Sequence, residues 1–188
     1  METEQQLLSN ILGGDRDAMR RLYDRYAGYT MATALRYIPD RDRAADVVQD
    51  AFVKILTSIS SSFNFRGEGS LKAWVTRVTA NQALDLLKKE SRTHQLLTTE
   101  ADLQPEQLQN LPDDEPDVGR LSPETLTALI AKLPPGYRAV LNLHVFEGHS
   151  HNEIAALLGI KPDTSASQFL RAKRMLAKMI NESINRND

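Results

Sequence analysis

The sequence predicts an all-α protein with two small helical domains joined by an acidic flexible linker. Apolar residues recur at helical spacing in both halves of the chain, and no alternating apolar run between turn residues indicates a strand. Between the halves, residues 93–121 are polar, contain three prolines and carry seven Asp or Glu residues against one Arg, which is typical of a flexible linker. The expected domains are therefore residues 1–92 and 122–188.

Four helices are expected in the first domain. An amphipathic segment over residues 3–13 ends at two glycines, and a second helix over residues 15–38 ends at Pro39. A third helix begins at Asp40 or Asp42. The residues expected to face inward are Leu22, Tyr23, Tyr26, Ala34 and Leu35 in the second helix and Ala44, Val47, Val48, Ala51, Phe52, Ile55 and Ile59 in the third.

Residues 60–69 are rich in Ser and Gly, and this composition predicts a loop. Ser70 is then expected to cap a fourth helix that continues to about Arg92. Its expected inward residues are Leu71, Trp74, Val75, Val78 and Leu87. The apolar spacing favours a core position for Trp74 over a stacking role, whereas the loop residues Phe63 and Phe65 suit either role.

The second domain begins with a strong helix start, Ser122-Pro123-Glu124, and its first apolar face consists of Leu126, Leu129, Ile130 and Leu133. Pro134-Pro135-Gly136 interrupts the pattern, and a helix from Tyr137 to Phe146 is expected to follow.

Residues 150–176 predict a helix-turn-helix. Ser150 and Glu153 fit a capping box, Gly159 suits the left-handed end of a short helix, and Pro162 suits the first position of the next. That second helix is expected to bury Phe169, Ala172, Leu176, Met179 and Ile180. Its expected outward residues are Ser165, Ala166, Ser167, Leu170, Arg171 and Arg174. A small, polar and basic outer face of this kind enters the major groove of DNA.

The composition excludes several classes of protein. The 188 residues are 41% hydrophobic and 26% charged, which is typical of a globular protein, and no apolar run reaches the roughly 18 residues of a membrane span. The N-terminus lacks the basic-then-apolar order of a signal peptide, so we expect a cytoplasmic protein without membrane insertion. There is no cysteine, and no phosphate-binding loop, nucleophile elbow or zinc-protease motif occurs, so neither an enzyme nor a cofactor is expected.

Two further features of the sequence bear on whether the chain binds a metal ion or duplex DNA. His144, His149 and His151 lie close in sequence, but no Cys accompanies them and the expected helix start at Ser150 would splay two of them, so no metal site is predicted. The net charge of -2 indicates weak binding to duplex DNA by the chain alone, because phosphate neutralisation supplies most non-specific affinity.

Both blocks resemble a known family, the extracytoplasmic-function group of bacterial sigma factors in the sigma-seventy superfamily. The matching residues are Asp42–Phe52, Phe65–Trp74, Arg77–Asn81 and Asp85–Lys89 in the first block and Leu133-Pro134, Tyr137-Arg138, Glu147-Gly148, Ser150-His151, Glu153–Ala155, Thr164, Ser167, Arg171 and Ala172 in the second. Both blocks in this order, with a variable tether between them, are more specific than a helix-turn-helix alone. The resemblance implies a region-two helical bundle followed by a region-four helix-turn-helix.

The resemblance also implies a function and partners. Such proteins join core RNA polymerase through its clamp and flap, place it on promoter DNA and begin strand opening, and many are held inactive by an anti-sigma factor. Opening about a dozen base steps costs on the order of 15 kcal/mol, so the polymerase is expected to supply most of that free energy.

Three sets of site residues follow from the residue chemistry together with the resemblance. The set expected to capture the minus-ten element is Asn64, Arg66, Lys72, Arg77, Asn81, Lys88 and Lys89. The set expected to read the minus-thirty-five element is Ser165, Ala166, Ser167, Leu170, Arg171 and Arg174. The set expected to contact polymerase is Arg41, Asp46, Gln49, Asp50 and Lys54.

Two alternatives stay open on the residues alone. The chain could be a stand-alone helix-turn-helix regulator with an N-terminal helical interaction domain, which would bind a palindromic duplex site without polymerase. It could also be an adaptor that sequesters a helical partner. The base preference is open as well, because many relatives are basic where this chain has Ala166, and Lys161 and Asn152 also differ from the common residues.

Overall fold

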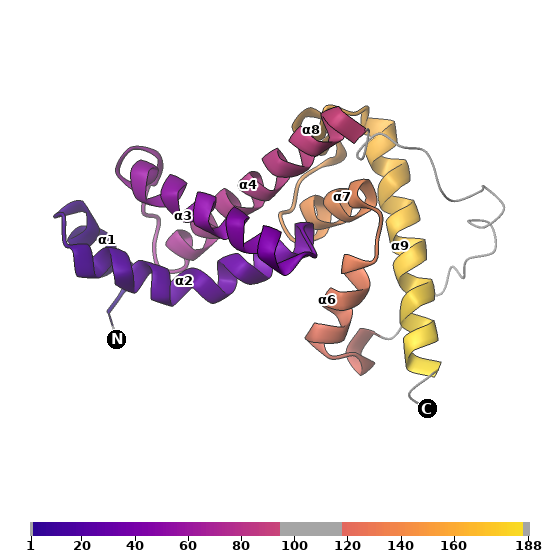
Figure 1. Cartoon of the computed structure of the whole chain (residues 1–188), viewed down its shortest axis with the longest axis horizontal. Helices are drawn as coiled ribbons and strands as arrows, with labels where there is room; N and C mark the ends of the chain where they lie inside the picture. Colours follow the sequence, from indigo (N-terminus) through magenta and orange to yellow (C-terminus); the bar gives the residue numbers. More distant parts are fainter. Residues whose placement is uncertain (1, 95–117, 186–188) are drawn as a thin grey trace. The chain divides into compact units, whose positions relative to one another are not determined.

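The computed structural model describes residues 2–94 and 118–185, and every regular element in these two ranges is helical, as the sequence predicts (Figure 1). The elements are α1 (Glu4–Leu12), α2 (Arg16–Tyr37), α3 (Arg41–Ser62), α4 (Ser70–His94), the 3-10 turn η1 (Val118–Arg120), α6 (Pro123–Ala131), α7 (Pro135–Val145), α8 (His151–Leu158) and α9 (Pro162–Asn185). The contacts divide the chain into two compact units, Met1–Asp85 and Leu86–Asp188, and each is described separately.

Side-chain caps define the helix starts of the N-terminal unit. Thr3 and Gln6 form a capping box at the start of α1, and Asp15 accepts a hydrogen bond from the amide of Asp17 at the start of α2. Asp40 caps α3 by accepting from the amide of Arg43 at 2.9 Å, which settles the two alternative starts considered for this helix. These caps satisfy amides that have no partner inside the helix. They therefore fix where each helix begins.

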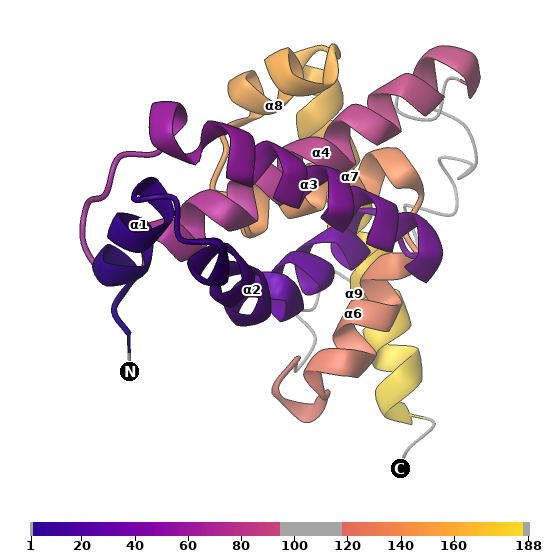
Figure 2. The same cartoon turned by 60° about the vertical axis from the view of Figure 1, so that its left-hand side comes forward.

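The core of the N-terminal unit forms where α2 packs against α1 and α3 (Figure 2). All seven residues expected to face inward from α3 are buried. The prediction for Tyr23 of α2 is wrong, because its side chain is 50% exposed and its ring lies 4.7 Å from that of Phe52. The buried stripe of α2 follows Leu22 and Tyr26, and position 23 is turned about 100° from position 22 on an α-helix.

The loop between α3 and α4 is shorter than expected. The prediction of a loop from Ser60 is wrong, since α3 continues to Ser62 and the loop comprises residues 63–69. Serine hydroxyls in the last turns donate to carbonyl oxygens of the preceding turn, as Ser58 does to Lys54 at 2.6 Å and Ser61 to Ser58 at 3.3 Å. These bonds satisfy the hydroxyls inside the helix, so the serines do not end it.

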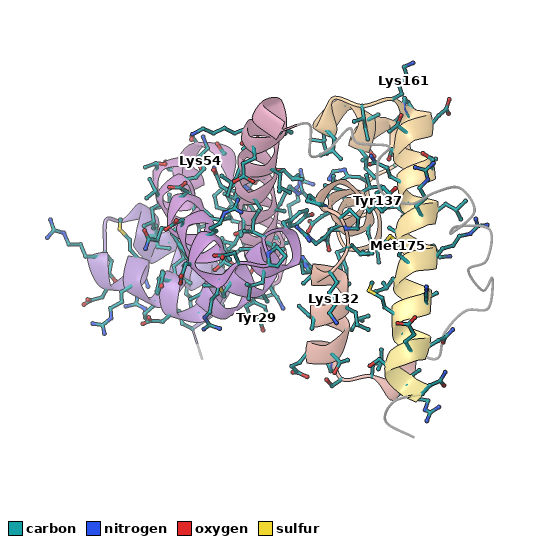
Figure 3. All side chains as sticks on the ribbon, turned by 45° about the vertical axis from the view of Figure 1, so that its right-hand side comes forward. Tyr29, Lys54, Lys132, Tyr137, Lys161 and Met175 are labelled. Carbon is teal, nitrogen blue, oxygen red and sulfur yellow. The ribbon has the colours of Figure 1, made fainter. Side chains whose placement is uncertain are left out.

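In the C-terminal unit, the long helix α9 packs against α6, α7 and α8 (Figure 1, yellow). Its described core contains Ile130, Leu133, Tyr137, Leu141 and Ala172. The partly buried apolar residues packed against this cluster are Leu126, Phe169, Met175, Leu176 and Met179, and Figure 3 labels Met175 together with Tyr137. Ile180 is buried in a neighbouring cluster, so the inward face expected for the second helix of the motif, α9, is confirmed.

The helices before the helix-turn-helix begin at prolines. Ser122 caps α6 with Pro123 at its first position, as predicted. α7 begins at Pro135, two residues before the expected Tyr137, because a proline in the first turn needs no amide partner. The flexible linker predicted for residues 93–121 lies mostly outside the described residues, which include only its first two residues, at the end of α4, and its last four, with η1. None of the helices described combines the length and apolar character that a bilayer crossing requires.

Candidate nucleic-acid interfaces

The loop 63–69 and the start of α4 are held by a carboxylate from another helix. Glu4 of α1 accepts hydrogen bonds from the amides of Gly69 at 2.9 Å, Leu71 at 2.9 Å and Lys72 at 3.2 Å. The Tyr26 hydroxyl donates to the same carboxylate at 2.7 Å. An anionic group placed on unsatisfied amides at a helix N-terminus also interacts favourably with the helix dipole. Glu4 therefore caps α4 across the fold.

This arrangement corrects the expected role of Ser70. Ser70 is the first residue of α4, and its hydroxyl bonds back into the loop, donating to the carbonyl of Gly67 at 2.6 Å and accepting from the amide of Arg66 at 3.2 Å. The first-turn amides are already satisfied by Glu4, so Ser70 does not cap the helix. Gly67 and Gly69 have φ of 111° and 90°, a conformation that favours glycine.

The hydrogen bonds at Glu4 determine the protonation states of Glu4 and Tyr26. Burial disfavours the charged form, but the bonds from the Tyr26 hydroxyl and from the three amides outweigh it, so the pKa of Glu4 is lowered. For Tyr26, burial comes first and the bond to Glu4 second, and both raise the pKa of its hydroxyl. Glu4 is thus a carboxylate, and Tyr26 a hydrogen-bond donor, over the physiological pH range.

The members of the expected minus-ten set that lie on α4 do not share one face of the helix. Arg77 and Asn81 are exposed and, with Lys88 on the same helix, fall within a stripe about 40° wide around the helix axis. Lys72 lies about 180° from Asn81 on this helix, and its ammonium sits 3.8 Å from the centroid of the Tyr29 ring. The structure therefore does not bring Lys72 to the face that carries Asn81.

The other members of this set lie at the two ends of the helix. Asn64 and Arg66 are exposed on the loop, and Lys89 is exposed on α4, turned about 80° from Asn81. Trp74 is partly buried and its ring lies 5.2 Å from that of Phe63, so the predicted core position of Trp74 is only partly realised. Phe63 anchors the loop through this contact.

The five residues expected to contact polymerase are all exposed on α3. Asp46 and Asp50 share a face of the helix, whereas Arg41 is turned about 140° from Asp46. Figure 3 labels Lys54, another of these residues. Sequence analysis missed two exposed apolar residues on this helix, Val53, about 20° around the axis from Asp46, and Leu56, about 20° from Gln49; they are 64% and 37% exposed. The full set of expected contact residues is Arg41, Asp46, Gln49, Asp50 and Lys54. Acidic groups next to exposed apolar ones suit a protein partner rather than DNA.

The helix-turn-helix has the predicted local geometry. Ser150 accepts from the Glu153 amide at 3.3 Å, and Glu153 accepts from the Ser150 amide at 2.8 Å, which completes the capping box of α8. The amide and hydroxyl bonds from Ser150 lower the pKa of Glu153. Gly159 is left-handed with φ of 69°, and α9 starts at Pro162. Lys161, just before α9, is exposed (Figure 3).

The outer face of α9 matches the expected minus-thirty-five set with one exception. Ala166, Ser167 and Leu170 are exposed, and Arg171 and Arg174 are partly exposed, with an Arg171 guanidinium nitrogen 3.4 Å from the Tyr137 hydroxyl. The expected outward position of Ser165 is wrong, because its side chain is fully buried. The full expected set was Ser165, Ala166, Ser167, Leu170, Arg171 and Arg174.

Ser165 is buried because it joins the two helices of the motif. Its hydroxyl lies 3.0 Å from Nδ1 of His151, whose ring stacks on that of His144 at 4.8 Å. Nδ1 of His144 is in turn 2.8 Å from the carbonyl of His149, so this nitrogen is occupied. Within residues 2–94 and 118–185, no group of three or more His, Cys, Asp or Glu residues is arranged to hold a metal ion.

Sequence analysis also missed Glu4, although the pattern held a signal. Glu4, Leu7 and Ile11 are spaced for one helix face, and all three are buried. A carboxylate on an apolar stripe indicates a buried acceptor that needs donors. The donors, however, come from residues about sixty-five positions away, so only the tertiary structure identifies them.

The two units match two parts of one protein family. Residues 22–93 match the family model for Sigma-70 region 2, and residues 124–176 match the model for Sigma-70, region 4. The chain is 28% identical to the RNA polymerase sigma-H factor of Pseudomonas aeruginosa, over 95% of this chain and 94% of that protein. It is 29% identical to the ECF RNA polymerase sigma-E factor of Haemophilus influenzae, over 95% of each.

The chain is also similar to chains in solved structures. One is that of the sigma factor RpoE in complex with the anti-sigma factor NepR from Bartonella quintana, with a TM-score of 0.49 and 21% sequence identity, covering 86% of this chain and 96% of that chain.

Proposed function

The chain belongs to the sigma-70 family, in its extracytoplasmic-function group, and from this membership we propose how its surfaces divide the work of transcription initiation. As an RNA polymerase sigma factor, it directs core polymerase to specific promoters. The observation that carries the proposal is that region 2 and region 4 follow one another on a single chain whose relatives match it over nearly their whole length.

The N-terminal unit captures the minus-ten element as single strand. Asn81 and Arg77 lie on one exposed stripe of α4, and Asn64 and Arg66 are exposed on the neighbouring loop. A carboxamide can bond a base edge in two places, and the arginines can neutralise the backbone of an opened strand. Lys72 is removed from this set, because it lies on the opposite side of α4.

The C-terminal unit reads the minus-thirty-five element in the major groove. The recognition face comprises Ala166, Ser167, Leu170, Arg171 and Arg174 on the outer side of α9. Ala166, Ser167 and Leu170 are small or apolar and suit contact with a thymine methyl or a base edge, whereas Arg171 can bond a guanine edge in two places. Ser165 acts inside the motif, where it connects α9 to His151.

The exposed face of α3 binds the polymerase. Asp46 and Asp50 would pair with basic groups of the partner, and Val53 and Leu56 would lose water at the centre of the contact. The protein performs no chemical step itself: the polymerase synthesises RNA and supplies most of the free energy of opening. Its site of action is therefore where the polymerase and the chromosome are, in the cytoplasm.

A reconstituted assay tests this function. Core RNA polymerase is incubated with genomic DNA, with and without the purified chain, and the 5′ ends of the transcripts are sequenced. The expected result is a set of start sites that requires the chain and shares two upstream elements.

The stand-alone regulator makes the opposite prediction. Tight binding of the isolated chain to a palindromic duplex in a gel shift, with no chain-dependent start site in the transcription assay, would overturn the proposal.

A further inference from the structure

Glu4 of α1 is a buried carboxylate whose hydrogen-bond donors are neutral groups. Its side chain is 3% exposed, and the donors are the Tyr26 hydroxyl and the amides of Gly69, Leu71 and Lys72. A buried charge is costly unless hydrogen bonds compensate it. Three of these four bonds come from the segment that leads from the loop into α4. This segment therefore provides most of the hydrogen bonding that offsets the cost of burying the Glu4 charge.

The contact between α1 and the loop is reciprocal. While Glu4 caps the start of α4, the loop residue Glu68 caps the start of α1, since its carboxylate accepts from the amide of Glu4 at 3.0 Å and 3.2 Å. Glu4 thus satisfies first-turn amides of α4, and the loop residue Glu68 satisfies the amide of Glu4 in the first turn of α1. The two helix starts are thereby joined without a salt bridge between them.

A second set of bonds extends this restraint to the exposed part of the loop. The Ser70 hydroxyl lies between the Glu4-bound amides and the loop tip, donating to the carbonyl of Gly67 and accepting from the amide of Arg66. Gly67 and Gly69 would otherwise leave the backbone many alternative conformations. Glu4 therefore holds the residues on both sides of Ser70, and the Ser70 hydroxyl in turn holds the backbone of Gly67 and Arg66.

We propose that Glu4 is a positioning residue for single-strand capture: it holds the loop 63–69 and the start of α4 in the conformation that receives the unpaired minus-ten bases. This inference rests on the proposed function of the N-terminal unit. Glu4 is buried and touches no DNA itself. Its contribution is to reduce the conformational entropy that the loop loses when a strand binds.

The test uses holoenzyme assembled from core RNA polymerase and the full chain carrying Glu4→Gln. The matched control is Glu2→Gln, the same change two residues earlier, where the carboxylate pairs with Arg21 of α2 at 3.1 Å and does not bond the loop. The probe is a fluorescent single-stranded oligonucleotide with the non-template strand of a promoter found in the transcription assay. A duplex carrying only the minus-thirty-five element is the second probe.

Glu4→Gln is expected to bind the single strand about tenfold more weakly, the change that about 1.4 kcal/mol produces, with unchanged binding to the duplex and to core polymerase. Glu2→Gln is expected to match the wild type on both probes. Equal single-strand affinity of the two variants overturns the inference, and so does an equal loss on both probes, which would indicate a general structural defect.

A second variant keeps the inference testable if Glu4→Gln does not fold. Ser70→Ala removes the partly exposed hydroxyl that bonds the backbone of Arg66 and Gly67 in the loop. The same selective loss of single-strand binding is expected. Unchanged binding by Ser70→Ala overturns the inference. Failure of the wild-type chain to start transcription at any promoter would instead refute the proposed function, so the two failures are distinguishable.

Discussion

Replacing Glu4 by glutamine should destabilise the N-terminal unit. One carboxylate oxygen of Glu4 accepts from the Tyr26 hydroxyl and the Lys72 amide, and the other accepts from the amides of Gly69 and Leu71. Glutamine keeps a single acceptor oxygen, so its NH2 group must face one of these pairs of donors. Because the tyrosine hydroxyl can turn to accept, the less costly orientation leaves the Lys72 amide unpaired and removes the negative charge from the other bonds.

The size of the effect follows from these contacts. A buried donor without an acceptor costs about 1–3 kcal/mol, and a bond to a charged group exceeds a neutral one by about 1 kcal/mol. We therefore expect the free energy of unfolding of this unit to fall by about 2 kcal/mol. For a unit of this size, that loss lowers the melting temperature by roughly 8–16 °C.

Trp74 makes the measurement specific to this unit. It is the only tryptophan of the chain, and it lies on α4 with its ring 5.2 Å from that of Phe63. Thermal unfolding of the full chain, followed by tryptophan fluorescence, therefore reports on the N-terminal unit. Glu2→Gln is the control and should leave the midpoint almost unchanged.

The pH dependence supplies a second criterion. The pKa of Glu4 is lowered in the folded state, so its stabilisation is present above the unfolded pKa of about 4.3 and is lost as the pH falls through the folded value. The difference between the midpoints of the wild type and Glu4→Gln should therefore shrink as the pH falls below about 4. A Glu4→Gln midpoint equal to that of Glu2→Gln at neutral pH would refute the reasoning.

Three further substitutions separate the surfaces. Arg171→Ala should weaken recognition of the minus-thirty-five element by about 1–3 kcal/mol, measured as holoenzyme binding to duplex probes. Lys173→Ala, about 160° away on α9, should keep the discrimination between promoter sequences. Equal loss of discrimination by the two variants would contradict the assignment. Asp50→Lys should weaken association with core polymerase at least about tenfold and change the salt dependence of that association. Asp24→Lys on α2 makes the same charge change and should leave the association unchanged. Matching dissociation constants for the two variants would exclude the α3 contact. Asn81→Ala should reduce promoter opening, measured by permanganate reactivity of unpaired thymines, with core binding intact; full reactivity would remove this residue from the capture site.

The helical architecture could be predicted from sequence because its determinants are local. The inward face of α3 is correct at every position, since a strong apolar period and Asp40 at its cap define one register. The same holds for α8, where the capping box and Gly159 lie within ten residues of each other. Local signals of this kind need no knowledge of the rest of the fold.

The errors arise where a polar or aromatic residue departs from its usual location. Ser165 is predicted on the small, polar and basic outer face of the second helix, but a histidine fourteen residues earlier gives its hydroxyl a buried partner. Tyr23 is predicted inward from its spacing with Leu22 and Tyr26, yet it lies beside the buried stripe of α2 and covers Phe52 from outside. Ser70 was assigned a cap that Glu4 already provides. In each case, a tertiary contact decides the outcome.

The two surfaces that we propose to face DNA differ in how they are held, and this difference predicts a functional consequence. The recognition face of α9 belongs to a regular helix, whose backbone bonds are internal and whose apolar side packs on α7 and α8. The loop 63–69 has few internal bonds and depends on Glu4 and Ser70. Changes at Glu4 should therefore alter the efficiency of strand capture without altering which minus-thirty-five sequence is chosen, and we expect promoter choice and promoter opening to vary independently in such variants.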